Sequence, residues 1–553
     1  MDTMKLAALL FPDVTLTPED LELRYPPRNL SEGARVTRFA PSPTGFLHIG
    51  GLFGALTDVL VAKASQGVSY LRIEDTDKKR EIADGVSAII RGFRDFGVEF
   101  TEGVTGFGTE KGDYGPYTQS QRVEIYHAVA KRLVETGKAY PCFCSADELT
   151  ALREQQEADG ALIRGYFGKY ARCRDLSLEQ IAGNLAAGKP WVLRFRSEGD
   201  ENKRICFDDV IRGKIEMPEN IIDEVLLKSN GIPTYHFAHV CDDHFMRTTH
   251  VIRGEEWLSS VPKHIAMFKS CGYKTPKYVH TAQVMKIDEE SGDKRKLSKR
   301  KDPEAAVSYF VEKGFPKEAV IEYLLTLLNS NFEDWRRANP EADAMDFPFN
   351  LKKMGASGCL FDLTKLTDVS KNVISHMKAA EIYEGVAAWA EVYQPEFYRI
   401  FTADPAFSTA VLNIDREVPK PRKDLAKWEE VPAYLSYFFH EPEADLALLP
   451  ERVSPEDARA ILSCCCAHYE PADDKDAWFA RMKSWCPELG YCPEVKEYKK
   501  APEAYKGHVG DLSSVLRLAV TGRTNTPDLC SIMQILGRQK VAERLERFAQ
   551  KLL

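Results

Sequence analysis

The chain has 553 residues, a formal net charge of −9 and 44% hydrophobic residues. This length predicts roughly three to five domains, and the hydrophobic fraction is sufficient for a sizeable core. No apolar run approaches the roughly 20 residues of a membrane span, so we expect no membrane partner. The acidic balance counts mildly against a nucleic-acid binder, although residues 294–301 and 420–427 form local basic patches.

Two further features indicate the compartment. Near the N-terminus, the apolar stretch Leu6–Phe11 is short and carries little flanking basic charge, so it is a poor secretory or organelle-targeting signal. The 13 cysteines include the triplet Cys464, Cys465 and Cys466. An odd count with adjacent cysteines favours reduced thiols over a disulfide framework. We therefore expect a cytoplasmic protein.

Residues 1–33 contain several prolines and are expected to form an N-terminal extension that packs on the surface. Arg35–Ala40 then predicts a short strand, which the prolines that follow it end. From His48 onward the apolar spacing predicts a helix. The start of a helix presents unpaired N–H groups, which suit a phosphate. A histidine that only caps the helix is the structural alternative.

The next segment continues an alternating β/α pattern. Ser69–Asp75 predicts a strand, and residues 81–96 predict a helix. Glu74, Asp75 and Asp77 follow the strand, at the edge where open α/β sheets bind ligands. Helix capping or a solvated loop suits Asp77 and Asp75.

Val123–Glu135 predicts a helix, and Trp191–Arg196 a strand. Between them lie Cys142, Cys144 and Cys173. A structural zinc site needs four ligands, and the sequence offers three thiols, with Tyr166, Tyr170 and Asp175 nearby. We favour free thiols over zinc here.

Residues 223–240 suggest two strands around a hairpin turn at Asn230 and Gly231. Asp242, Asp243 and His244 are then expected to shape a loop through hydrogen bonds rather than bind a metal. Thr248–Arg253 predicts a strand, and a helix follows from Glu255. The basic run 294–301 follows a polar loop, helices follow the run, and from about residue 376 the chain is expected to be helical.

Two signatures carry a family resemblance. Residues 41–51 resemble the first signature of class I aminoacyl-tRNA synthetases; they are Pro41, Ser42, Pro43, Thr44, Gly45, Phe46, Leu47, His48, Ile49, Gly50 and Gly51. Gly51 stands where many members have a second histidine. Residues 296–300 resemble the second signature of the same class; they are Lys296, Leu297, Ser298, Lys299 and Arg300.

Residues 223–238 and 251–257 closely resemble the bacterial-type glutamyl-tRNA synthetases, and residues 511–548 resemble their C-terminal module. His239 departs from the family, because many members have asparagine there. The resemblance implies an α/β fold: a Rossmann-like catalytic domain (34–110 and 221–300) with an inserted acceptor-binding domain (111–220). A stem-contact domain (301–375) and an all-α anticodon-binding region (376–553) are expected to follow.

The resemblance also implies a reaction, in which glutamate is activated with ATP and Mg²⁺ and transferred to tRNA(Glu). The implied catalytic residues are His48, Lys296 and Lys299, which would also bind ATP together with Gly50, Glu256 and Trp257. The implied glutamate-binding residues are Arg38, Ala40, Ser42, Glu74, Tyr235 and Arg253. Because arginine pairs with a carboxylate through two hydrogen bonds, Arg253 is expected to read the substrate side chain. We expect a monomer.

Four alternatives remain at this point. A glutaminyl-tRNA synthetase shares the first signature but usually lacks an arginine at position 253, and an enzyme that also glutamylates tRNA(Gln) is equally compatible with the signatures. Enzymes that modify a tRNA base lack the long C-terminal region. A non-catalytic relative would not be expected to keep His48, Glu74, Lys296 and Lys299.

Overall fold

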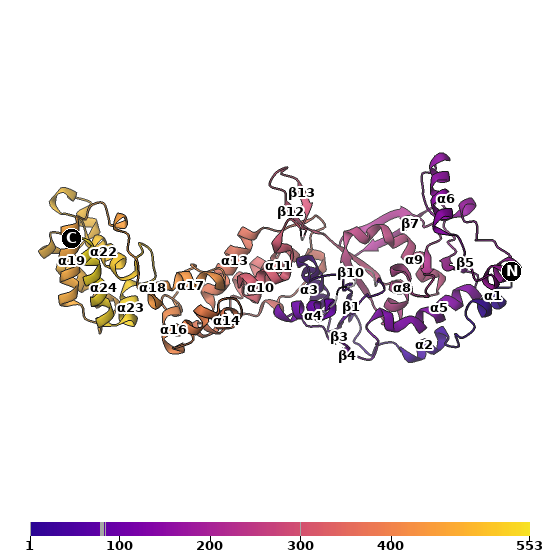
Figure 1. The fold of residues 1–553 in the computed structure, drawn as a ribbon, viewed down its shortest axis with the longest axis horizontal. Coiled ribbons are helices and arrows are strands. Elements are labelled where there is room, and N and C mark those ends of the chain that lie inside the picture. Colours follow the sequence, from indigo (N-terminus) through magenta and orange to yellow (C-terminus); the bar gives the residue numbers. More distant parts are fainter. Residues whose placement is uncertain (1, 78–81, 83, 299) are drawn as a thin grey trace. The chain divides into compact units, whose positions relative to one another are not determined.

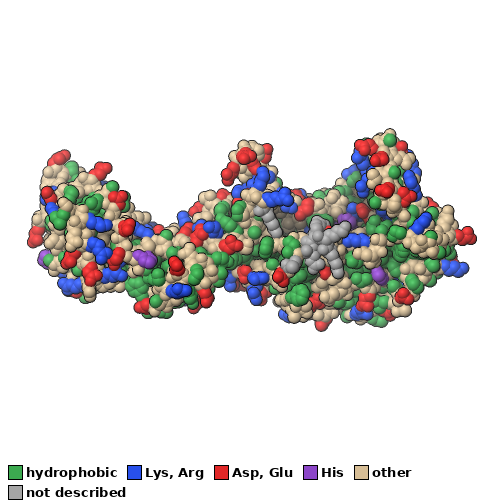
Figure 2. All heavy atoms as spheres, viewed as in Figure 1, with side chains coloured by type: hydrophobic (Ala, Val, Ile, Leu, Met, Phe, Trp, Pro, Cys, Tyr) green, Lys and Arg blue, Asp and Glu red, His purple; other side chains and the backbone are tan. Residues whose placement is uncertain are grey.

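The computed structural model describes residues 2–77, 82, 84–298 and 300–553 (Figure 1). They form two compact units. The first unit comprises Met1–Tyr309 and Ile321–Asp362, and the second comprises Phe310–Val320 and Leu363–Leu553. None of the helices in the described ranges is both long and apolar enough to cross a membrane. Acidic and basic side chains are interspersed on the face drawn in Figure 2.

The elements up to residue 338 mix strands and helices. The helices are α1 (Thr3–Leu10), α2 (Pro18–Arg24), α3 (Ile49–Lys63), α4 (Gly85–Asp95), α5 (Val123–Glu135), α6 (Ala146–Ala158), α7 (Leu178–Ala186), α8 (Tyr235–Phe245), α9 (Val261–Ser270), α10 (Val307–Lys313), α11 (Lys317–Leu328) and α12 (Phe332–Ala338). The strands, which continue to residue 360, are β1 (Val36–Phe39), β2 (Val68–Leu71), β3 (Glu102–Gly106), β4 (Thr109–Lys111), β5 (Ala139–Cys142), β6 (Val192–Phe195), β7 (Arg204–Asp209), β8 (Gly213–Pro218), β9 (Val225–Leu227), β10 (His250–Gly254), β11 (Lys277–Thr281), β12 (Val284–Ile287), β13 (Lys294–Lys296) and β14 (Cys359–Leu360).

Parallel strands form the centre of the first unit. One sheet has the order β1-β2-β3-β4, in which β1, β2 and β3 are parallel and Arg38 is in register with Tyr70. A second sheet has the order β10-β11-β7-β8, with β10 parallel to β11. The backbone N–H of Thr249 donates to the carbonyl of Val36 at 3.0 Å, so β10 continues alongside β1. The predicted α/β class with a parallel, Rossmann-like sheet is confirmed.

The chain between the two halves of this core forms an antiparallel sheet. Its order is β5-β6-β9, and α5 leads into it. The helix predicted over Val123–Glu135 and the strand predicted over Trp191–Arg196 are both present, as α5 and β6. Tyr140, Cys142 and Tyr166 belong to a small buried cluster beside this sheet.

The strand prediction after residue 230 is wrong. Only β9 precedes the turn, in which the Lys228 N–H donates to the Ile232 carbonyl at 2.8 Å, and the residues from Tyr235 onward form α8. Asp242, Asp243 and His244 therefore lie on a helix and not in a loop. The hairpin turn at Asn230 and Gly231 suggested a second strand, but α8 is held by contacts with distant parts of the chain, such as that of Asp242 with Arg122.

The N-terminal extension is built into the first unit. The Thr3 hydroxyl donates to the carbonyl of Glu135 at 2.7 Å, at the end of α5. Arg28 forms two hydrogen bonds to the carboxylate of Glu102, at 2.7 and 3.0 Å, and its guanidinium lies 3.8 Å from the centroid of the Tyr114 ring. Its Nε also donates to the carbonyl of Met246, just after α8. The extension thus fixes the end of the helix that carries Asp242 and Asp243.

The second unit is helical, as predicted for the chain after about residue 376. Its helices beyond residue 362 are α13 (Leu363–His376), α14 (Ala379–Tyr393), α15 (Pro395–Phe401), α16 (Pro405–Leu412), α17 (Val431–Tyr434), α18 (Ser436–Phe439), α19 (Pro455–His468), α20 (Lys475–Leu489), α21 (Val495–Tyr498), α22 (Val509–Thr521), α23 (Leu529–Leu536) and α24 (Arg538–Lys551). Leu512, Leu516 and Ile532 are fully buried in its core.

Candidate active site

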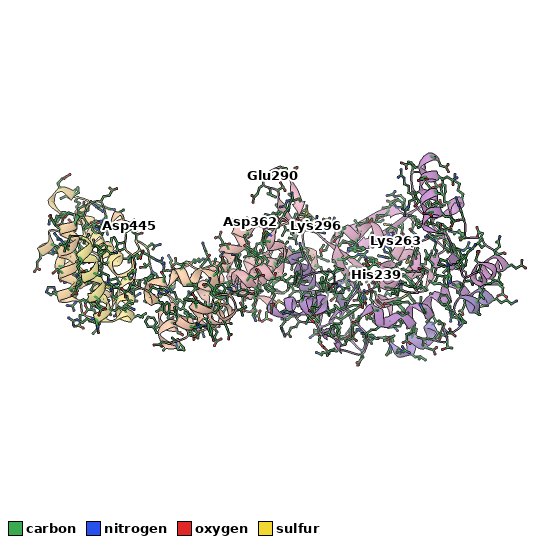
Figure 3. The ribbon with its side chains drawn as sticks, in the orientation of Figure 1. His239, Lys263, Glu290, Lys296, Asp362 and Asp445 are labelled. Atoms are coloured by element: carbon green, nitrogen blue, oxygen red, sulfur yellow. The ribbon has the colours of Figure 1, made fainter. Side chains whose placement is uncertain are left out.

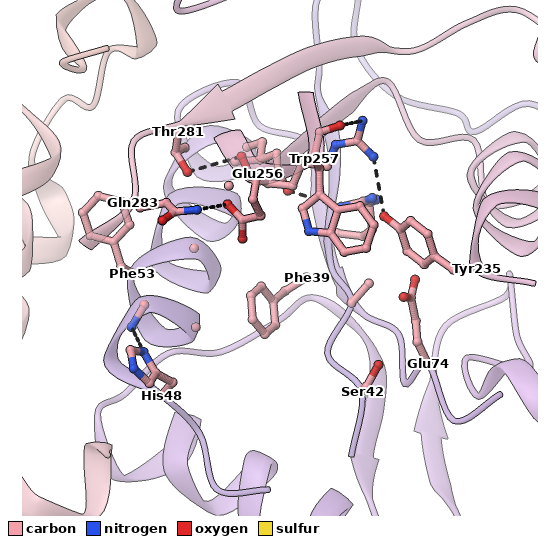
Figure 4. A pocket seen from close by; sticks show the side chains of 18 of the residues that line it. Phe39, Ser42, His48, Phe53, Glu74, Tyr235, Glu256, Trp257, Thr281 and Gln283 are labelled. Atoms are coloured by element: carbon pink, nitrogen blue, oxygen red, sulfur yellow. Dashed lines mark hydrogen bonds between the residues drawn. The ribbon is translucent and has the colours of Figure 1, made fainter. Parts of the chain in front are cut away.

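A cavity of about 830 Å³ opens at the carboxyl ends of β1, β2, β10 and β11 (Figure 4). This is the edge of a parallel sheet at which α/β proteins bind ligands. All the predicted substrate and nucleotide residues within the described ranges line it: Arg38, Ala40, Ser42, His48, Gly50, Glu74, Tyr235, Arg253, Glu256, Trp257 and Lys296. Lys299, which was predicted to contact the triphosphate, lies outside the described residues.

Gly51 also lines the cavity, but Pro43, Phe46, Leu47 and Ile49 of the first signature do not. Leu47 and Ile49 are buried in the core, and Pro43 is also buried. Phe46 is exposed. Of the second signature, Leu297 lines the cavity, and the Ser298 N–H donates to the Asp302 carboxylate at 2.9 Å. Much of each signature therefore holds the backbone in place.

His48 is the N-cap of α3. Its Nδ1 accepts a hydrogen bond from the Gly50 N–H at 3.0 Å, so a neutral His48 carries its proton on Nε2. A Cβ atom on Gly50 would lie 3.2 Å from this Nδ1. Gly50 is thus required by the cap as well as by the space in the cavity. The N–H groups of Gly50 and Gly51 both bond to His48, so the start of α3 offers a ligand mainly the positive end of the helix dipole.

Lys296 ends β13, whose hairpin with β12 has Glu290 at its tip (Figure 3). Its neighbour Arg295 pairs with Asp288 at 2.7 Å and with Asp302 at 2.6 Å. These ion pairs fix the base of the hairpin. Lys296 is exposed and lines the cavity, so its charge faces the space that a ligand would occupy.

A buried network of opposite charges supports one wall of the cavity. Arg38 Nε lies 3.2 Å from each carboxylate oxygen of Asp243, and Arg72 Nη1 lies 2.7 Å from one of them. Burial would raise the pKa of Asp243, but Arg38 and Arg72 outweigh it and hold that pKa well below its usual range. Asp243 thus stays ionised and fixes both arginines.

Glu74 connects this network to the cavity. It is 7% exposed, and its Oε1 accepts from Arg72 Nη2 at 3.1 Å. Burial raises the pKa of Glu74, and the charges of Arg72 and Arg38 oppose that rise. A positively charged ligand group in the cavity would therefore be bound favourably beside Glu74, because it would stabilise the ionised carboxylate together with Arg72.

Sequence reasoning missed the layer of the network behind these residues. Arg122 Nε donates to Asp242 at 2.6 Å, and the Gln119 amide and the Tyr126 hydroxyl donate to the same carboxylate at 2.9 and 3.0 Å. Arg122 and Asp242 are fully buried. A buried charge has to be paired, but the sequence did not show which partners would meet.

Tyr235, Trp257 and Glu256 also line the cavity, and Tyr235 lies beside Glu74 (Figure 4). The rings of Tyr235 and Trp257 have centroids 4.4 Å apart (Figure 4). The Glu256 carboxylate accepts from the Gln283 amide at 2.9 Å. These residues thus add flat aromatic surfaces and hydrogen-bonding groups to the lining of the cavity.

The three cysteines near the inserted sheet form a cluster. The sulfur atoms of Cys142, Cys144 and Cys173 all lie within 4.8 Å of one another. The Tyr166 hydroxyl lies 3.4 Å from the Cys144 sulfur, whereas Asp175 pairs with Arg196 at 3.0 Å. The cluster thus brings three thiols together, one fewer than the four ligands of a structural zinc site, and the Tyr166 hydroxyl is the polar group beside them.

Comparison with known proteins identifies the class. The family described as "tRNA synthetases class I (E and Q), catalytic domain" matches residues 35–338, and "Anticodon binding domain" matches residues 403–549. The chain therefore belongs to the class I tRNA synthetases, which are ATP-dependent ligases.

The relatives narrow the family further. The chain is 50% identical to the glutamate–tRNA ligases of Clostridium perfringens and Acetivibrio thermocellus, over 99% of this chain and 100% of each relative. It is also similar to the crystal structure of a glutamate tRNA ligase from Elizabethkingia meningosepticum in complex with its amino acid. That structure has a TM-score of 0.75 at 26% identity, covering 94% of this chain and 100% of the other. The chain belongs to the glutamate–tRNA ligase family.

Proposed function

We propose that the cavity activates L-glutamate with ATP and that the enzyme transfers the glutamyl group to the 3′-terminal adenosine of tRNA(Glu). The observation that carries this proposal is the sorting of charge in one cavity. His48, the N-terminus of α3 and Lys296 form a phosphate-binding end, and Arg38, Glu74 and Arg253 form an amino-acid end.

The first chemical step joins glutamate to AMP. The α-carboxylate attacks the α-phosphorus, the bond to the bridging oxygen breaks, and pyrophosphate leaves with its electron pair. The attacking carboxylate is already ionised, since its pKa is about 4 or lower, so no general base is needed. Catalysis therefore depends on alignment and on charge stabilisation. Within the described cavity, the Nε2–H of His48 and the ammonium of Lys296 face the phosphates, and Lys299 is proposed to assist them.

Other residues position the substrates. Gly50 admits the nucleotide, and Glu256 and Trp257 hold its adenosine. Mg²⁺ would screen the phosphate charges when it is bound with ATP. In the second step, the terminal ribose hydroxyl of tRNA attacks the acyl carbon and AMP leaves.

Glutamate recognition follows from the amino-acid end. Glu74 accepts the α-ammonium group, and Arg38, Ala40, Ser42 and Tyr235 surround the backbone of the substrate. Arg253 pairs with the side-chain carboxylate. Glutamine would leave this guanidinium without its charged partner, at a cost of roughly 3–5 kcal/mol. This difference is large enough to reject glutamine without an editing domain.

The other parts of the chain have proposed roles. We assign residues 34–110 and 221–300 to catalysis, 111–220 to the tRNA acceptor end, 301–375 to the tRNA stem and 376–553 to the anticodon. The match of an anticodon-binding family to residues 403–549 supports the last assignment. We also propose a monomer in the cytoplasm.

Zinc would have a structural role, if the protein binds it. Cys142, Cys144, Cys173 and the Tyr166 hydroxyl would hold the ion beside β5, away from the proposed chemistry. Elemental analysis of protein purified without chelator tests this role. One zinc ion per chain would support it, and no zinc would support the free thiols that the sequence favoured. Cys144→Ser should abolish binding if the ion is present.

ATP–pyrophosphate exchange tests the proposal. We expect exchange with glutamate when tRNA(Glu) is present and no comparable exchange with glutamine. Omitting tRNA should abolish the exchange, as the family resemblance implies. Equal exchange with glutamine would contradict the role of Arg253, and no exchange with either amino acid would contradict the catalytic assignment.

A further inference from the structure

The partners of Arg253 are all uncharged groups. Its Nε donates to His280 Nε2 at 3.1 Å, and its Nη2 donates to the carbonyl of Trp257 at 3.3 Å. Its Nη1 lies 3.4 Å from His264 Nδ1 and 3.5 Å from the Tyr235 hydroxyl. Among the described residues, no carboxylate lies within salt-bridge distance of this guanidinium.

The other arginine that lines the cavity is held differently. Arg38 pairs with the buried carboxylate of Asp243, which also holds Arg72. A carboxylate neutralises the arginine that it positions, whereas an imidazole accepts the same hydrogen bond without cancelling the charge. The positive charge of Arg253 is therefore available to an anion in the cavity.

His280 is set as an acceptor by its second ring nitrogen. Its Nδ1 lies 2.7 Å from the Asp209 carboxylate, which also accepts the backbone N–H of His280 at 3.0 Å. His280 is fully buried. With the Nδ1 proton donated to Asp209, the lone pair on Nε2 faces Arg253.

His264 also has to accept from Arg253, because a guanidinium has only donors, and its proton is then on Nε2. Its Nε2 lies 2.9 Å from His236 Nδ1, and its Nδ1 is directed toward Arg253. It is fully buried, and burial holds its pKa well below the usual range. Two neutral imidazoles from two different elements, α9 and β11, thus converge on one guanidinium.

We infer that His280 and His264 are positioning residues that hold Arg253 as uncharged acceptors, and that they thereby set the preference for a substrate with an anionic side chain. This inference rests on the proposed function, because it assumes that Arg253 receives the glutamate side chain. It adds four residues to the specificity apparatus: the two imidazoles and the groups that fix their tautomers, Asp209 and His236.

A matched pair of variants at position 280 tests the inference. His280→Asn keeps an N–H for Asp209 but has no acceptor at the Nε2 position, whereas His280→Gln places an acceptor there. Both variants remove the ring, so a purely structural role would affect both alike. Tyr278, whose ring centroid lies 5.8 Å from that of His280, loses the same neighbour in each.

The measurement is tRNA-dependent exchange, with the KM for glutamate and the KM for ATP determined separately. We expect His280→Asn to raise the KM for glutamate about tenfold, equivalent to about 1.4 kcal/mol, with little change in the KM for ATP. His280→Gln should recover most of this loss. An unchanged glutamate KM in His280→Asn, or equal losses in both variants, would overturn the inference.

The pH profile gives a second readout. Burial lowers the pKa of His280 from the ordinary value of 6.5. The groups that face the two imidazoles are Asp209 and Arg212 at His280, and His236, His239 and Lys263 at His264, with Arg253 facing both. The KM for glutamate should stay flat from pH about 8 to about 6 and rise only in stronger acid. A rise centred at the ordinary histidine pKa would contradict neutral, buried acceptors.

Arg253→Met separates the inference from its premise. If the unmodified enzyme does not use glutamate, the proposed function fails. If that enzyme is active but Arg253→Met leaves the glutamate KM unchanged, the assignment of Arg253 fails, and the inference fails with it. If Arg253→Met raises the glutamate KM and His280→Asn does not, the inference alone fails.

Discussion

Two helices of this chain begin with the same local motif. In α3, His48 Nδ1 accepts from the Gly50 N–H at 3.0 Å, and in α22, His508 Nδ1 accepts from the Gly510 N–H at 3.0 Å. Both histidines have extended backbone angles and are followed by a β-branched residue and a glycine. The cap itself is therefore a property of a three-residue pattern and carries no information about function.

The difference lies at the third helical position. Asp511 follows Gly510, accepts the His508 N–H at 2.8 Å and pairs with Arg452 at 3.2 Å. The start of α22 is thus already occupied by an anion of the chain itself. Gly51 occupies the equivalent position in α3 and lines the cavity, so the same dipole is left open to a ligand. A capping motif becomes a candidate phosphate site only where the chain leaves it unfilled.

The strongest test transfers the α22 arrangement to α3. Gly51→Asp should lower kcat/KM for ATP by about 10²–10³-fold, because a carboxylate would repel the phosphates at the helix start. Gly51→Asn is the matched control, since it has nearly the same shape without the charge. A Cβ atom at this position would lie 3.0 Å from the end of the Leu47 side chain, in both variants. Equal losses in both would show that crowding, not charge, is responsible.

The two histidines should differ in activity but not in stability. His48→Ala should lower kcat for glutamate activation by about 10²-fold, since it removes a donor to the phosphates. His508→Ala should leave that rate nearly unchanged. Each variant should lose about 1 kcal/mol of unfolding free energy, because each removes a cap. A similar fall in kcat for His508→Ala would break the comparison.

The reverse substitution sharpens the comparison. Asp511→Gly opens the start of α22, but the described residues around it form no phosphate-binding cavity. We expect no additional ATP-binding site and a stability loss of about 1 kcal/mol from the broken capping box. Isothermal titration with an ATP analogue counts the sites. A second ATP-binding site would mean that an unfilled helix cap is sufficient to bind phosphate without a cavity around it.

A pH dependence of stability is also expected in the first unit. Burial lowers the pKa values of His236, His239 and His250 to about 4, from 6.5. Between these values the unfolded chain binds more protons than the folded chain, so stability should fall as the pH drops below 6.5. Hydrogen exchange can be measured at α3 and α22, at pH about 7 and about 5. The protection of the backbone amides should fall more in α3 than in α22 when the pH is lowered. An α3 signal that does not change would contradict the neutral, buried state of these residues.

The sequence predicted those parts of the site whose conformation is decided locally. The strand before Pro41, the helix from His48 and the full span of α5 follow from turn residues and apolar spacing. The features that the sequence did not predict all depend on contacts between residues far apart in the chain. The helix from Tyr235 is held by pairs such as Asp242 with Arg122, which are 120 residues apart. The position of the Tyr166 hydroxyl beside the cysteines likewise depends on the tertiary fold.

Aminoacylation of tRNA(Glu) by the intact enzyme, with glutamate and glutamine compared under identical conditions, tests the central claim most directly. Because a missing carboxylate partner costs roughly 3 kcal/mol or more, kcat/KM should favour glutamate by at least about 10²-fold. Such a preference, lost in Arg253→Met, is the predicted result. Comparable values for the two amino acids would contradict a cavity whose specificity depends on an unneutralised arginine.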